Sequence, residues 1–183
     1  CIAITPPETG TTSVVQGVKL VPDTVYVVSF DARAGVPANG PQLTMAAMLQ
    51  GDKPIAFFEG SAEQKKALAT PAAVTDKWQT FTQKIGPVPA TVQGKTVKKL
   101  MLYWNVKPGE PGSRLFLDNI RITAEAAAPQ STPQSVPEKG GAKPAAQGSG
   151  LLKNGSFEQG TGGYWINRAA AVKIEKEDAS DGR

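Results

Sequence analysis

The side chains that could carry acid–base or nucleophilic chemistry in this chain are carboxylates, hydroxyls and one thiol. Histidine is absent from the 183 residues, which removes the commonest general base and metal ligand and excludes a Ser/His/Asp triad. A single cysteine cannot form an internal disulfide or a thiolate zinc site. Paired carboxylates could hydrolyse a glycoside, but the acids fall in turn-like or solvated stretches, as at Glu59, Glu63, Asp76 and Glu110. The sequence therefore predicts a protein that is not an enzyme.

Aromatic and amide side chains alternate with apolar ones in "KKLMLYWNV", residues 98–106. In an extended strand, Leu100, Leu102 and Trp104 would share one face, while Tyr103 and Asn105 would share the other. The first set has the character of a core row. Tyr103 and Asn105 are therefore predicted to be a surface pair.

The elements that must position these residues are short β-strands, each bounded by Pro, Gly or Asp. A short helix is expected at residues 61–69, with Ser61 as its N-cap. Cys1 begins a short strand and is predicted to be a small buried side chain. This spacing predicts an all-β antiparallel sandwich or barrel, with strands at residues 25–34, 43–50, 54–60, 78–85, 98–106 and 114–122.

Composition divides the chain into three parts. Residues 1–125 hold most of the predicted strands, and residues 126–150 form a Pro/Gly/Ala-rich segment whose one large apolar residue is Val136. Such a segment cannot bury a core, so we interpret it as a linker. Residues 151–183 have too little apolar mass to fold alone and must pack on something else.

Charge and hydropathy exclude two classes of partner. The net charge is +4, but the 20 Lys and Arg residues are dispersed and are not interleaved with aromatics, so a nucleic-acid partner is not expected. No apolar run approaches the ~18 residues of a membrane span. The sequence starts at Cys1 without a methionine, and we expect it to be a processed product or a unit of something longer.

Several stretches resemble carbohydrate-binding modules of the family 4 and 9 type. "LLKNGSFEQGTGGYW" (151–165) is similar to the first strand and loop of such modules, and "VKIEKEDASDGR" (172–183) to the part that follows. "SVVQGVKLVPDTVYVVSFDARA" (13–34), "DKWQTFTQKI" (76–85) and "RLFLDNIRI" (114–122) resemble the middle strands, the Trp-containing strand and the final strand. The resemblance implies a galactose-binding-like jelly-roll β-sandwich.

The order of these motifs is permuted, because the first strand of the family follows its last strand here. Residues 151–183 would then supply the first strands, either to the sandwich of their own chain or to a neighbouring copy. Donation that does not close on itself generates a filament. The expected partners are therefore copies of the chain itself or a polysaccharide.

The resemblance also implies a structural calcium ion near the first and last strands. Its ligands would be Asp118 and Glu158, with backbone carbonyls near Asn154 and Lys153. Several oxygens at ~2.3–2.6 Å suit this hard cation. Alternatively, Asp118 and Glu158 cap turns or pair with Lys and Arg.

Sugar binding, as the resemblance implies it, needs exposed rings with amides beside them, since rings stack on pyranose faces. The candidates are Tyr103, Asn105, Phe57 and Tyr164, whereas Trp78 and Trp165 are expected in the core. Two functions remain open: an extracellular or cell-surface filament subunit built by strand donation, or a monomeric polysaccharide-binding module of an extracellular glycoside hydrolase.

Overall fold

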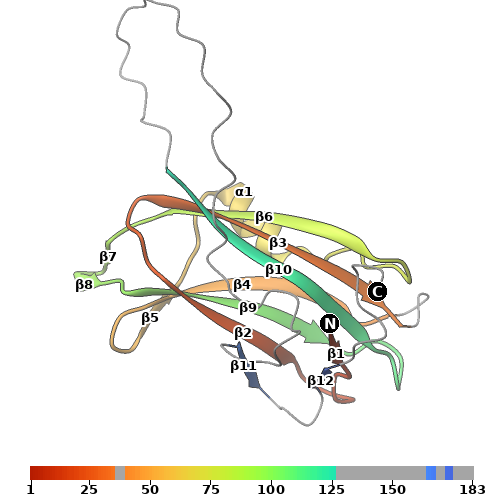
Figure 1. Ribbon diagram of the computed structural model, residues 1–183. Helices are drawn as coiled ribbons and strands as arrows, with labels where there is room; N and C mark the ends of the chain where they lie inside the picture. Colours follow the sequence, from red (N-terminus) through yellow and green to blue (C-terminus); the bar gives the residue numbers. More distant parts are fainter. Residues whose placement is uncertain (36–39, 127–163, 168–171, 175–183) are drawn as a thin grey trace, which may run out of the picture.

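Two five-stranded antiparallel sheets face each other, with β6, β3 and β10 above β4, β9 and β2 (Figure 1). The computed structural model describes residues 1–35, 40–126, 164–167 and 172–174. Sheet A holds, in spatial order, β12 (Val172–Ile174), β1 (Ile2–Ile4), β10 (Leu115–Ala126), β3 (Thr24–Ala34) and β6 (Gln79–Val88). Sheet B holds β11 (Tyr164–Asn167), β2 (Thr12–Lys19), β9 (Lys99–Lys107), β4 (Gln42–Gln50) and β5 (Pro54–Phe57). The all-β sandwich that the sequence predicted is confirmed.

The core lies between the sheets because the side chains of their long strands alternate in hydropathy. Every second residue of β3 and β4 is buried, as the two-residue period of a strand requires. Trp104 of β9 is 0% exposed, and its ring meets that of Phe30 edge-on at 6.2 Å between centroids. Leu100 and Leu102 are buried in the same row, so the predicted core face of β9 is confirmed.

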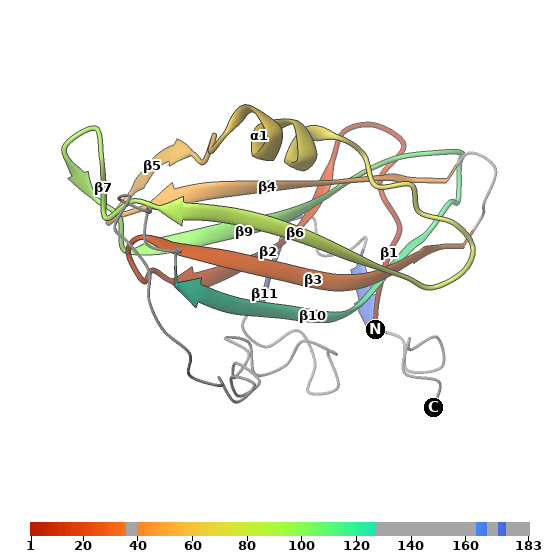
Figure 2. The same cartoon turned by 90° about the horizontal axis from the view of Figure 1, so that it is seen from above.

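A short helix, α1 (Ala62–Ala69), packs against β4 and β6 at one side of the sandwich (Figure 2). Ser61 caps it: its hydroxyl accepts from the Gln64 backbone N–H, and the Gln64 side chain accepts from the Ser61 N–H. Gln64 Nε2 also donates to the Gly86 carbonyl at 2.6 Å, which ties the helix to β6. The predicted helix and N-cap are confirmed. Within the described ranges, no helix has the length and apolar character to cross a membrane.

A second, smaller apolar cluster lies on the outer face of sheet A. Cys1, Ala3 and Phe116 form it, and Trp78 packs against it half-buried. The Arg33 guanidinium lies 4.0 Å from the centroid of the Phe116 ring and 5.4 Å from that of Trp78. Cys1 is buried, as predicted. The expectation that Trp78 belongs to the main core is wrong, because Trp78 directly precedes β6 and packs against this outer cluster.

The C-terminal strands pair with the N-terminal ones of the same chain. β12 is antiparallel to β1, with Ile174 opposite Ile2, and β11 is antiparallel to β2, with Trp165 opposite Val15. Of the stretch at residues 151–165 that resembles a first strand and loop, residues 151–163 lie outside the described residues. Completion of a neighbouring copy's sandwich stays a prediction.

A glycine in β6 is expected to be required by close packing. Gly86 has φ +129°, and a Cβ there would lie 2.5 Å from the Thr24 carbonyl oxygen. We expect Gly86→Ala to lower the free energy of unfolding by about 2 kcal/mol or more, measured by urea denaturation. The matched control is Gly94→Ala, where φ is +72° but nothing lies within 4 Å of a Cβ. That change is expected to cost about 1 kcal/mol, and equal losses would contradict the packing argument.

Candidate functional site

A groove of about 390 Å³ opens on the outer face of sheet B. Its lining combines two aromatic rings with an amide, three hydroxyls and one lysine. The lining residues come from the approach to β2 and from β2, β4, β5 and β9: Thr11, Ser13, Thr44, Ala46, Phe57, Tyr103, Asn105 and Lys107.

The strand register explains why these residues meet. Asn105 stands between Ser13 of β2 and Thr44 of β4, and Tyr103 stands between Val15 and Ala46. Since their neighbours along β9 face the core, these side chains must face outward. β2, β9 and β4 therefore bring two neighbouring cross-strand rows to the same surface. One row is polar, and the other has Tyr103 at its centre.

The amide of Asn105 is fixed by its neighbour across the ladder. The Ser13 hydroxyl donates to Asn105 Oδ1 at 2.7 Å. This bond orients the amide, and the amide nitrogen has two N–H groups that can donate to a ligand. The groove thus presents Asn105 as a hydrogen-bond donor.

Tyr103 and Phe57 supply the rings. Tyr103 is half-buried, its hydroxyl lies 4.0 Å from the Met48 sulfur, and burial raises the pKa of its phenol above the ordinary value. The phenol therefore keeps its proton at neutral pH and can donate a hydrogen bond. Phe57, in the edge strand β5, is 63% exposed. Its ring is therefore accessible to a ligand at the border of the groove.

Three of the four residues predicted to bind a ligand, Tyr103, Asn105 and Phe57, thus line one groove. For the fourth, Tyr164, the structure describes the backbone, which stands opposite Gln16 in the ladder. Its role stays a prediction. In the same ladder, the backbone of Trp165 stands opposite Val15, which in turn stands opposite Tyr103. Trp165 therefore belongs to the same cross-strand row as Tyr103.

Sequence reasoning missed the hydroxyl and lysine residues of the groove, Thr11, Ser13, Thr44 and Lys107. Their partners across the sheet are far away in sequence, as in the pairing of Ser13 with Asn105. No local pattern reveals such a pairing. The single usable signal was alternation along β9, which places Lys107 in the row of Tyr103 and Asn105.

Asp118, the predicted metal ligand in β10, is 1% exposed. Its Oδ1 accepts the backbone N–H of Asn119 at 2.9 Å, and its Oδ2 lies 3.8 Å from the amino nitrogen of Cys1. Within the described ranges, no three His, Cys, Asp or Glu side chains gather as a metal site would require. The other predicted ligands, Glu158, Asn154 and Lys153, lie outside the described residues.

A second cavity, of about 470 Å³, lies beside α1. Phe30, Leu43, Met45 and Phe81 contribute apolar surface to it, and α1 contributes Glu63 and Lys66. None of the residues predicted to bind a ligand lies there. The groove of sheet B is therefore the better candidate site.

Comparison with known proteins gives similarity to solved structures alone. No family model matches the chain, and no curated protein matches it. A structure described as "PbXyn10C CBM APO" matches over 94% of this chain and 84% of its own length, with 14% identity and a TM-score of 0.47. Another, described as "CBM4 structure and function", matches over 67% of this chain and 81% of its own, with 17% identity and a TM-score of 0.44. At these scores, the ligand of this chain has to be inferred from its own residues.

Proposed function

We propose that this protein is a non-catalytic carbohydrate-binding module that holds a polysaccharide against the outer face of sheet B. The observation that carries the proposal is that the rings of Tyr103 and Phe57 line one groove with the amide of Asn105. A ring offers a flat apolar face to the C–H face of a pyranose, and an amide or hydroxyl beside it bonds the sugar hydroxyls.

The groove is equipped for binding and not for hydrolysis. The part of its lining that the structure describes includes no aspartate and no glutamate. Hydrolysis of a glycoside needs a pair of carboxyl groups flanking the bond, one acting as an acid and the other as a base or nucleophile. The lining therefore supports a binding role.

The proposal is tested by affinity electrophoresis of the protein in gels that contain soluble polysaccharides, together with a glycan array. We expect retention by at least one polysaccharide, with no release of reducing sugar on long incubation. Migration unaffected by every polysaccharide, together with an array without signal, would remove the support for a carbohydrate ligand.

A polysaccharide ligand agrees with an extracellular or cell-surface location, which belongs to the same proposal. A filament built by strand donation has no specific support among the described residues, because β11 and β12 pair with β2 and β1 of their own chain. We therefore favour the monomeric module. Light scattering of the purified protein separates the two, since a filament would give a mass that grows with concentration.

A structural calcium ion at Asp118 remains part of the proposal, and its test is thermal. A bound ion stabilises the folded state by mass action, so excess calcium should raise Tm by about 5 °C relative to protein in chelator. Asp118→Asn should abolish this response, whereas Asp76→Asn, at an exposed turn, should preserve it. Equal melting of the unaltered protein in calcium and in chelator would show that the carboxylate has a structural role without metal.

A further inference from the structure

The charged side chains on the outer face of sheet B are all of one sign. Among the described residues, the outward rows of β2, β9, β4 and β5 contain three charged side chains, which are Lys19, Lys99 and Lys107. The outer face of sheet A carries both signs, since Lys84 and Glu125 form an ion pair at 3.5 Å there, and Asp31 and Arg33 stand further along β3. Among the described strand residues, the face that carries the groove is thus the one without a negative charge.

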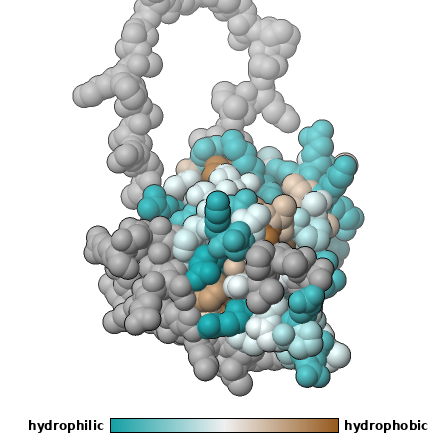
Figure 3. All heavy atoms as spheres, turned by 90° about the vertical axis from the view of Figure 1, so that its right-hand side faces the viewer, coloured by the Kyte–Doolittle hydropathy of each residue, from teal (hydrophilic) through white to brown (hydrophobic). Residues whose placement is uncertain are grey.

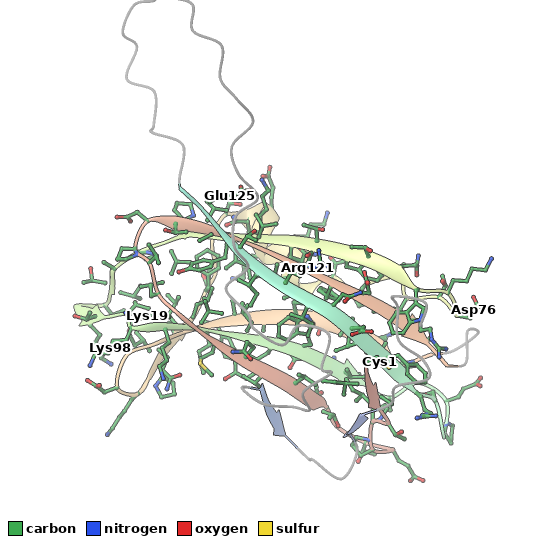
Figure 4. The ribbon with its side chains drawn as sticks, in the orientation of Figure 1. Cys1, Lys19, Asp76, Lys98, Arg121 and Glu125 are labelled. Atoms are coloured by element: carbon green, nitrogen blue, oxygen red, sulfur yellow. The ribbon has the colours of Figure 1, made fainter. Side chains whose placement is uncertain are left out.

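These lysines keep their charge available. None of the three forms an ion pair within the described part of the chain, where the lysine–carboxylate pairs join Lys65 to Glu59, Lys84 to Glu125 and Lys98 to Asp52. Lys19 is labelled at the end of the sandwich opposite to Cys1 and Asp76 (Figure 4). Lys107 ends β9 at the other end, where the described surface is mainly hydrophilic with small separate hydrophobic patches (Figure 3).

The groove offers several hydrogen-bond donors. Lys107 contributes three N–H groups and Asn105 the nitrogen of its amide, while the hydroxyls of Thr11, Ser13 and Thr44 can donate as well as accept. Among the described residues of the lining, no carboxylate is present to accept hydrogen bonds from a neutral sugar. The complement of such a site is a ligand rich in acceptors and carrying negative charge.

We propose that the ligand of this groove is a glycan that bears carboxylates, namely a polysaccharide containing uronic acid residues. One carboxylate binds between Lys107 and Asn105, while the ring of the same or the next sugar lies on Tyr103. Lys99 stands opposite Lys19 in the ladder, at the other end of the outward row of β9. At the rise per residue of an extended strand, Lys99 is about 27 Å from Lys107. A uronate polymer repeats its charge along its length and can therefore meet both ends. This inference rests on the proposed function.

The test compares oligouronides of defined length with the same oligosaccharides after reduction of their carboxyl groups to alcohols. Titration calorimetry at low salt should show the oligouronide binding at least tenfold more tightly. The difference should shrink as ionic strength rises, because salt screens exposed charges. Lys107→Gln should remove most of it, whereas Lys77→Gln, an exposed lysine in the turn before β6, should leave it unchanged.

The outcomes separate this inference from the proposed function. Equal binding of the two oligosaccharides, or equal effects of the two lysine substitutions, overturns the inference and leaves a module for neutral glycans. Failure of the unaltered protein to bind either oligosaccharide, or any glycan on the array, overturns both. Binding of a single-stranded DNA oligomer as tightly as the oligouronide would show selection by charge alone and would also overturn the inference.

Discussion

Replacing Tyr103 with alanine is expected to weaken binding of the retained polysaccharide at least tenfold while the fold is preserved. Tyr103 lies in the middle of the outward row of β9, beside Asn105, and its ring lines the groove. Loss of an aromatic face from a sugar contact costs about 1.5 kcal/mol, which corresponds to a tenfold change in Kd. Titration calorimetry measures the affinity.

The matched control is Tyr103→Phe, which keeps the ring and removes the hydroxyl. If stacking dominates, this variant should bind within a few-fold of the unaltered protein. A loss as large as that of the alanine variant would assign the effect to the hydroxyl. Unchanged affinity of the alanine variant, with an unchanged circular dichroism spectrum, would show that the ligand lies elsewhere.

Replacing the next residue, Trp104, with alanine is expected to destabilise the fold without touching the groove. Its side chain is fully buried and contacts Phe30 edge-on. Truncating a buried tryptophan removes its apolar contacts and leaves a cavity, at a cost of about 3–5 kcal/mol. The free energy of unfolding in urea measures the loss, which is a large fraction of the stability of an ordinary domain.

Trp104→Phe is the companion variant. Within the described residues, the Trp104 indole nitrogen has no hydrogen-bond partner, so phenylalanine loses volume but no hydrogen bond. We expect a cost of about 1–2 kcal/mol, well below that of alanine. If the alanine variant were as stable as the unaltered protein, the register that turns Trp104 inward and Tyr103 outward would be wrong.

The adjacent pair Tyr103 and Trp104 also shows what sequence can predict. Alternation along a strand is local, so the face of each residue of β9 followed from the sequence, and β3 and β4 began within one residue of the expected positions. The capping box of α1 is local as well, because Ser61 and Gln64 are three residues apart. Such features depend on neighbours that the sequence places side by side.

Features that depend on pairing between distant strands could not be predicted. Phe57 joins Tyr103 in one groove because β5 and β9 both pair with β4. The sequence pattern of neither strand indicates that they share this neighbour. The same holds for Trp78, whose packing against the outer cluster of sheet A depends on residues that are distant in sequence, such as Cys1 and Phe116. The small hairpin of β7 (Thr91–Val92) and β8 (Lys95–Thr96) was missed despite a local turn at Gln93 and Gly94, both with positive φ.

The pairing of Ile2 with Ile174 and of Val15 with Trp165 constrains how the chain folds. These ladders join opposite ends of the sequence, and closing a long loop costs entropy that grows with its length. Contacts of such high sequence separation form slowly. During synthesis, the outer edges of β1 and β2 must therefore remain without these partners until β12 and β11 emerge, and exposed edges invite aggregation. The central strands can assemble earlier, but each sheet gains an edge strand, β12 or β11, that is synthesised after all of them.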